Sequence, residues 1–186
     1  MRGTLWQIGD PVDWYSTVFE LIDMRSFSNL WFWIALAVMW SSTSHYVLGV
    51  PWDMVVRARK GGGQAMEDVG TLAAINTRRV LYISRESGLL LTGVIFFLLT
   101  GSAILGWYYH REFAQAVLLL ALPMSVVWVL SVRTAAQIEA GALEGDVLIA
   151  LLMRHRLLVQ IIGMMSIFVT AMWGMYQNMT TSALGG

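Results

Sequence analysis

The chain has no cysteine and few charged residues. Without cysteine it cannot form a disulfide, a thiolate nucleophile, or a zinc or iron–sulfur site built on cysteine ligands. Charged residues make up only 13% of the 186 residues, whereas a soluble domain typically has about 25%. The 12 basic residues are balanced by 12 acidic ones, so the sequence lacks the strongly basic surface expected of a nucleic-acid-binding protein.

The chain is instead rich in apolar residues, which make up 57% of it and give a mean hydropathy of +0.62. One soluble core of this size cannot bury so much apolar surface, so we expect a bilayer to solvate part of it. Residues 1–26 hold acidic side chains where a signal peptide has its apolar region. We therefore expect this segment to be retained.

Four apolar segments are long enough to cross a membrane as helices, which takes about 20 residues each. They cover about residues 29–50, 88–109, 113–132 and 157–176. We therefore predict an all-α membrane protein in which residues 27–186 form a domain of four transmembrane helices.

Basic residues are concentrated in the connections that follow the first and third spans. They are Arg57, Arg59, Lys60, Arg78, Arg79, Arg85, Arg133, Arg154 and Arg156. Only Arg2, Arg25 and Arg111 lie on the opposite side. Because loops rich in Lys and Arg stay in the cytoplasm, we predict that both connections are cytoplasmic and that both termini are on the other side.

The two cytoplasmic connections, residues 51–87 and 133–156, are predicted to be helical hairpins. Gly61–Gly63 is a helix breaker, and we expect the first span to continue as a helix past a kink at Pro51 up to this turn. The second hairpin is expected to turn around Gly141–Gly145. Each hairpin would extend two spans into the cytoplasm as a small bundle.

Residues 1–26 have the pattern of an amphipathic helix. Asp10 and Pro11 suit its first turn, and apolar and acidic side chains lie on opposite faces. We predict an interfacial helix that lies flat on the outer face of the membrane or docks onto a neighbouring subunit.

A polar run interrupts the first span at Ser41, Ser42, Thr43 and Ser44. Consecutive residues point all around a helix, so little of this turn is expected to face lipid. Hydroxyls in membrane helices bond to carbonyls one turn earlier, and small residues allow close helix packing. We predict that this run, together with Gly106 and Gly174, packs against other helices or a partner; lining a pore between subunits is the alternative.

His45 and His155 fall at similar depth in two different helices and suggest a second kind of site. Two such histidines could ligate haem b or contact a quinone, although His45 bonding to a nearby carbonyl or hydroxyl is the simpler interpretation. Arg78, Arg79 and Arg85 are predicted to contact anionic lipid or a partner, or to pair at the surface. No catalytic constellation and no metal site is recognisable.

The segment "DWYSTVFELIDMRSFSNLWFWIALAVMWSSTSHYVLGVPWDMV", residues 13–55, resembles a family of small integral membrane proteins from alphaproteobacteria. The resemblance extends over most of the chain. It implies a bacterial inner-membrane location and no assigned activity. Members have been labelled as components of the Suf iron–sulfur assembly machinery, but a chain without cysteine has no thiolate with which to hold a cluster.

The centres of the predicted spans contain no Asp, Glu, Lys or Arg, unlike a proton-coupled transporter. We therefore predict a non-enzymatic accessory, assembly or scaffold subunit of a larger membrane complex, such as a bioenergetic complex, or a self-assembling oligomer. Its expected partners are membrane lipids and other membrane protein subunits or further copies of itself. A haem b- or quinone-binding redox subunit and an oligomeric channel are the alternatives.

Overall fold

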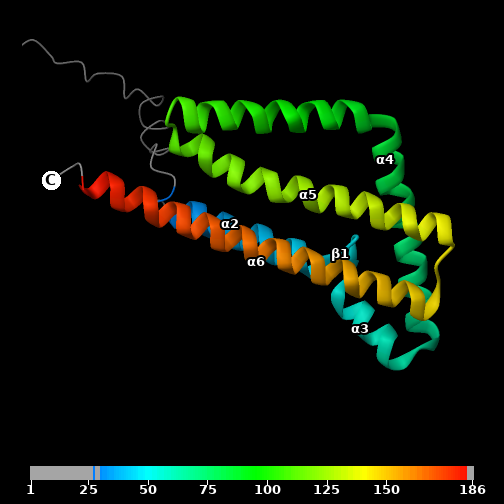
Figure 1. Cartoon of the computed structure of the whole chain (residues 1–186). Helices are drawn as coiled ribbons and strands as arrows, with labels where there is room; N and C mark the ends of the chain where they lie inside the picture. Colours follow the sequence, from blue (N-terminus) through cyan, green and yellow to red (C-terminus); the bar gives the residue numbers. More distant parts are fainter. Residues whose placement is uncertain (1–26, 28–29, 184–186) are drawn as a thin grey trace, which may run out of the picture.

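The computed structural model describes residue 27 and residues 30–183, and this part of the chain is almost entirely helical (Figure 1). Three of its helical segments are long and apolar enough to cross a membrane: Gly63–Tyr108, Glu112–Gly141 and Gly145–Thr180. The predicted all-α architecture is therefore confirmed, together with three helices that could span a membrane. The predicted interfacial helix, residues 1–26, lies outside the described residues.

The first apolar segment forms a shorter helix than predicted. Helix α2 spans Leu30–His45, and its 16 residues reach about 24 Å at 1.5 Å per residue. The hydrocarbon core of a bilayer is about 30 Å thick. Four membrane crossings thus stay a prediction, because α2 alone falls short of the length that the other three helices exceed.

A tight hairpin follows α2, so the prediction that the first helix continues past a kink at Pro51 is wrong. Strand β1 (Tyr46–Val47) pairs antiparallel with strand β2 (Val50–Pro51). The two turn residues, Leu48 and Gly49, have φ values of +51° and +77°. Two positive φ values are the signature of the type I′ turn, whose twist suits a two-residue hairpin.

Two helices with a sharp glycine break between them come next. Helix α3 covers Trp52–Gly61 and helix α4 covers Gly63–Ala103. Gly62 and Gly63 have φ values of +57° and +52°, which residues with a Cβ rarely adopt. The chain therefore reverses at the break that the glycine run predicted.

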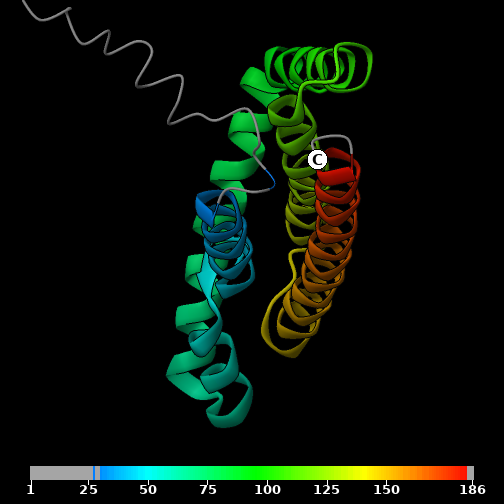
Figure 2. The ribbon, with the colours of Figure 1, turned by 90° about the vertical axis from the view of Figure 1, so that its left-hand side faces the viewer.

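Helix α4 is continuous, as predicted, but it is not straight. Figures 1 and 2 show two arms that point in different directions. We call residues 63–87 the first arm and residues 88–103 the second arm. The second arm continues into a π-helical turn, η2, at Ile104–Tyr108.

Helices α5 (Glu112–Gly141) and α6 (Gly145–Ala183) form an antiparallel pair. Ala142, at the end of α5, adopts the left-handed conformation with φ of +42°, which reverses the chain within the turn region predicted from its glycines. Helix α2 runs alongside α6, and the first arm of α4 lies with α2 and α3 on one side of the α5–α6 pair (Figure 2).

The molecule has two distinct ends (Figure 1). The start of α2, the turn at residues 109–111 and the end of α6 share one end, which we call the terminal end. The hairpin β1–β2 and the turns at residues 61–63 and 142–144 share the other, which we call the turn end.

The larger hydrophobic core lies at the turn end. It joins residues of the hairpin, α3, the first arm of α4, α5 and α6: Val47, Leu48, Val50, Val55, Ala58, Val69, Ala73, Leu81, Ala135, Ile138, Leu148, Ile149 and Leu152. The first arm contributes Val69, Ala73 and Leu81. They are four and eight residues apart, as expected for one buried helix face. The best-packed part of the chain is therefore separate from its most apolar helical segments.

A smaller cluster lies among the apolar helices. Leu36 and Trp40 of α2 pack against Val127 of α5 and Val159 of α6. A Cβ on Gly163 would lie 2.8 Å from the Trp40 ring, so the glycine is needed for α2 and α6 to approach each other.

Candidate functional site

The polar run of α2 is only partly covered by the rest of the chain. The Thr43 hydroxyl donates to the Met39 carbonyl at 2.7 Å, and the Ser44 hydroxyl donates to the Ser41 carbonyl at 3.0 Å. Ser41 and Ser42 are exposed. Packing inside the chain thus does not account for these two serines, which lie on a face open to lipid or to another chain.

The two histidines of the predicted redox site have different surroundings. His45 is exposed at the end of α2, with its ring 5.2 Å from that of Tyr46. His155 of α6 is only 4% exposed. His155 lines a cavity at the turn end that His45 does not line. The structure therefore does not bring the two rings to one site.

The hydrogen bonds around His155 favour one tautomer of its ring. The Thr134 hydroxyl donates its only proton to the Leu130 carbonyl at 2.9 Å. With that proton on the Leu130 carbonyl, the 2.9 Å contact between Thr134 Oγ1 and His155 Nδ1 is a bond that Nδ1–H donates in the matching tautomer. In the neutral ring this leaves Nε2 as a hydrogen-bond acceptor.

The cavity beside His155 is small and lined by further acceptors. Its volume is about 200 Å³, and Thr43, Trp128 and Ser131 also line it. The hydroxyl protons of Thr43 and Ser131 are donated to the carbonyls of Met39 and Val127. Cofactor pockets typically measure about 300–1,000 Å³, so this geometry gives the haem prediction no support.

Arg156 makes a connection that the sequence did not reveal. Its Nε donates to the Ser44 carbonyl at 3.3 Å, and its guanidinium lies 3.9 Å from the centroid of the Trp52 ring. Carbonyls in the last turn of a helix lack helical partners, and a cation there is favoured by the helix dipole. Arg156 thus binds α6 to the end of α2 and the start of α3.

A group of hydrogen bonds around Gln115 at the terminal end, which we call the polar hub, was also not predicted from the sequence. Gln115 of α5 is buried, and its amide donates to the Gly106 carbonyl at 2.7 Å. Its carbonyl oxygen accepts from Trp173 Nε1 at 3.0 Å and from Gln177 Nε2 at 2.6 Å. One side chain therefore joins η2, α5 and α6.

The two glycines predicted as packing positions are both in close contacts. A Cβ on Gly106 would lie 2.9 Å from Gln115 Cγ. A Cβ on Gly174 would lie 3.3 Å from the rings of Phe27 and Trp33. Because Gly106 has no side chain, Gln115 can pack directly against it. Gly174 allows Phe27 and Trp33 to pack against α6 in the same way.

The three arginines predicted to contact lipid or a partner differ in their contacts. Arg85 of α4 makes a bidentate ion pair with Glu139 of α5. The Nε of Arg78 donates to the Ala74 carbonyl at 3.4 Å, and Arg79 is exposed. Arg85 therefore links two helices, while Arg79 is the most open to an outside partner.

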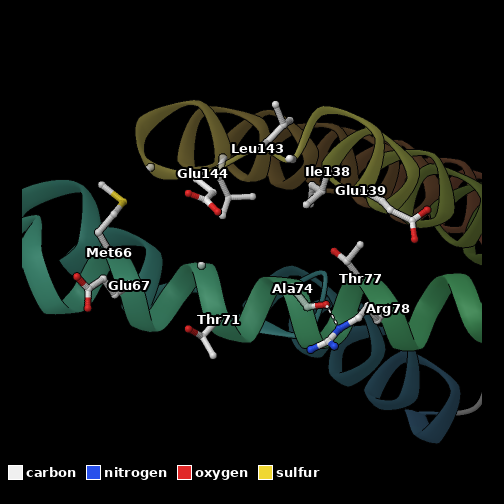
Figure 3. A pocket seen from close by; sticks show the side chains of 14 residues that line it. Met66, Glu67, Thr71, Ala74, Thr77, Arg78, Ile138, Glu139, Leu143 and Glu144 are labelled. Carbon is white, nitrogen blue, oxygen red and sulfur yellow. Dashed lines mark hydrogen bonds between the residues drawn. The ribbon is translucent and has the colours of Figure 1, made fainter.

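A cleft of about 640 Å³ separates the first arm of α4 from the turn between α5 and α6 (Figure 3). Glu67 and Glu144 lie toward one end of it and Glu139 toward the other. Within the described part of the chain, no group of three His, Asp or Glu side chains is placed to hold a metal ion. The carboxylates are thus spread along the cleft rather than gathered into a site.

The second arm of α4 is the least covered apolar segment. Its 18-residue apolar window has 0% of its residues buried, against 22% for α5 and 28% for α6. Leu89 and Phe97 are 92% and 77% exposed. Only one side of the arm is accompanied by another helix, α5 (Figure 1).

Comparisons with protein-family models, with curated proteins and with solved structures found no match for this chain. Its fold defines its class: a helical protein with three segments long and apolar enough to cross a membrane. A more particular function must be inferred from the geometry of its surfaces and cavities.

Proposed function

We propose that this chain is a non-enzymatic accessory or scaffold subunit of the bacterial inner membrane that binds another membrane protein chain through the second arm of α4. The observation that supports this most is the absence of burial along the apolar window of this arm. Lipid could also cover such a surface. The residues that the arm exposes distinguish a protein partner from lipid.

Two glycines of the second arm favour a protein partner over lipid. A Cβ on Gly93 or Gly101 would meet no described atom within 4 Å, so the rest of the described chain makes no use of them. A glycine inside a helix costs about 1 kcal/mol relative to alanine. Small residues on a membrane helix allow the backbone of a second helix to approach closely, which would offset that cost.

We further propose that α2 is a fourth crossing, with both chain termini on the periplasmic side. In support, α2, the second arm of α4, α5 and α6 run in alternating directions between the two ends of the molecule (Figure 1). The basic residues of the turns also lie at the turn end, as expected for the cytoplasmic side. The exposed Ser41 and Ser42 would offer a second contact surface, either for a partner or for a pore between copies.

A quinone-binding role is the second candidate. The cavity beside His155 is smaller than a typical cofactor pocket, so it would hold only the single ring of a quinone head group, which several acceptors near the apolar helices could bind. A quinol hydroxyl could donate to them. Extraction of bound quinone from the purified wild type and from His155→Ala would test this. Equal quinone content in the two proteins would exclude the role.

The accessory-subunit proposal is tested by gentle solubilisation from native membranes and native mass spectrometry of the intact assembly. We expect a stoichiometric second chain, either a different subunit or another copy. The double variant Gly93→Leu/Gly101→Leu should lose it, because two large side chains would hold a partner helix away.

The matched control is Gly61→Leu, since Gly61 also has no described atom within 4 Å of a Cβ but lies in α3. It should retain the partner. A wild-type protein that is always a monomer, or a partner that survives the double variant, would overturn the proposal.

A further inference from the structure

A groove runs between the second arm of α4 and the middle of α5. Its volume is about 530 Å³. Arg133 and Ser84 line one end, and apolar side chains including Phe96, Leu99 and Val129 line the remainder. The groove thus combines a cation at one end with an apolar channel, which is the distribution found in a phospholipid.

The length of the groove fits one leaflet of a bilayer. On α5 the lining extends from Ser125 to Arg133, about 12 Å at 1.5 Å per residue. On α4 it extends from Ser84 to Leu99, about 22 Å by the same measure. Half of a hydrocarbon core is about 15 Å, so an acyl chain can lie along the groove with its head group beside Arg133.

Arg133 is chemically available for a head group. It is exposed, and among the described residues it has neither an ion pair nor a hydrogen bond from its side chain. In contrast, Arg57 is paired with Asp53 and Arg85 with Glu139. A guanidinium binds phosphate oxygens in a bidentate manner, and basic pockets between membrane helices on the cytoplasmic side bind anionic head groups.

We propose that this groove binds an anionic glycerophospholipid of the leaflet at the turn end, with its phosphate on Arg133 and an acyl chain between α4 and α5. The site goes beyond the proposed function, because it lies on a different face of the second arm. At about 100° per residue, Phe96 and Leu99 face the groove, Gly101 faces nearly the opposite way, and Gly93 points about 110° away from the groove. A partner and the lipid can therefore bind at once.

The test is native mass spectrometry of the full chain in detergent, titrated with phosphatidylglycerol or with phosphatidylcholine. We expect one phosphatidylglycerol to bind more tightly than phosphatidylcholine. Arg133→Gln should weaken phosphatidylglycerol binding about fivefold, the effect of one cation at a membrane surface. Arg154→Gln is the matched control, because Arg154 is exposed on α6 and does not line the groove.

A second variant tests the apolar part of the groove. Val129 is 47% exposed, so Val129→Trp should be tolerated while filling the space of the acyl chain. It should reduce phosphatidylglycerol binding with Arg133 intact. The proposal is overturned if Arg133→Gln binds as the wild type does, if the two lipids bind equally, or if a co-purified protein chain occupies the groove.

Discussion

Gln115 shows how one polar side chain can organise the end of an apolar bundle. It accepts two hydrogen bonds from α6 and donates one to the π-helical turn η2. A π-helical turn leaves backbone carbonyls displaced from their regular partners, and buried polar groups must find other bonds. Gln115 provides that bond for Gly106.

We predict that Gln115→Leu destabilises the protein by about 1–3 kcal/mol, because the Gly106 carbonyl and the donors of Trp173 and Gln177 lose their shared partner. Thermal unfolding in detergent, followed by circular dichroism, measures this. Gln137→Leu is the control, since Gln137 is exposed on the same helix. Equal unfolding temperatures for the two variants would contradict the prediction.

Gly106 gives a second prediction at this scale. A Cβ there would lie 2.9 Å from Gln115 Cγ and 3.1 Å from its backbone nitrogen, so Gly106→Ala must displace α5 or η2 and should lower stability by about 1–3 kcal/mol. Gly101→Ala, five residues earlier, meets nothing described within 4 Å and should be neutral or stabilising. If Gly101→Ala were the less stable of the two variants, the close contact between Gly106 and Gln115 would not limit stability.

The sequence revealed part of this residue-scale picture. Gly106 was recognisable from its small-residue spacing within an apolar helix. Gln115 and Arg156 were not, because their partners lie 58 and 112 positions away along the chain. A hydrogen bond across such a separation leaves no local pattern, and only the folded arrangement makes it visible.

At the scale of elements, the end of α2 is the clearest departure from the sequence prediction. The residues after His45 are mostly apolar and so lengthen the first apolar segment, and strands of two residues are too short to show a periodicity. Tertiary contacts determine where α2 ends and the hairpin begins. Val47 and Val50 are buried in the core at the turn end, and Arg156 binds the carbonyl of Ser44 where α2 ends.

We therefore predict that Arg156→Gln loosens the hairpin β1–β2. The variant loses a charge-assisted bond to a helix end and the stacking on Trp52, together about 1.5–3 kcal/mol. Hydrogen–deuterium exchange of a peptide covering Val47 to Val50 should accelerate by more than about tenfold.

The control for this experiment is Arg154→Gln, because Arg154 is exposed two residues away on the same helix. It should leave the exchange of the hairpin unchanged. Equal acceleration in both variants would mean that the charge of α6, and not the contact of Arg156, holds the hairpin.

At the scale of the whole molecule, the length of α2 bears on whether it crosses the membrane. Its 16 residues are fewer than the about 20 that a crossing usually needs. Local thinning of the bilayer can accommodate a short helix at modest cost. The alternating directions of the four apolar segments (Figure 1) support a crossing.

The absence of native cysteine makes the crossing directly testable with single cysteines. We predict that Leu30→Cys reacts with a membrane-impermeant maleimide from the periplasmic side, and that Lys60→Cys reacts only after the inner membrane is opened. Tyr109→Cys and Glu144→Cys bracket α5 and report the two sides independently. Reaction of Leu30→Cys and Lys60→Cys from the same side would show that α2 does not cross.

Helix content and the glycine turns could be predicted because they depend on local composition. The direction of the first arm of α4 could not be predicted from the sequence. Its stripe of Val69, Ala73 and Leu81 indicates a buried face, but the sequence does not say against which helices that face packs. A straight extension of the bundle and an arm that crosses the ends of α5 and α6 have the same local pattern.

The two arms of α4 also make the molecule unequal in width. Among the described residues, the turn end carries the first arm, α3 and the hairpin in addition to the apolar helices, whereas the terminal end carries the apolar helices (Figures 1 and 2). If the turn end lies in the cytoplasm, as we propose, the described part of each copy is a wedge with its broad side toward the cytoplasmic leaflet. Copies crowded together would tilt away from one another on that side, so the chain should favour membrane that bulges toward the cytoplasm.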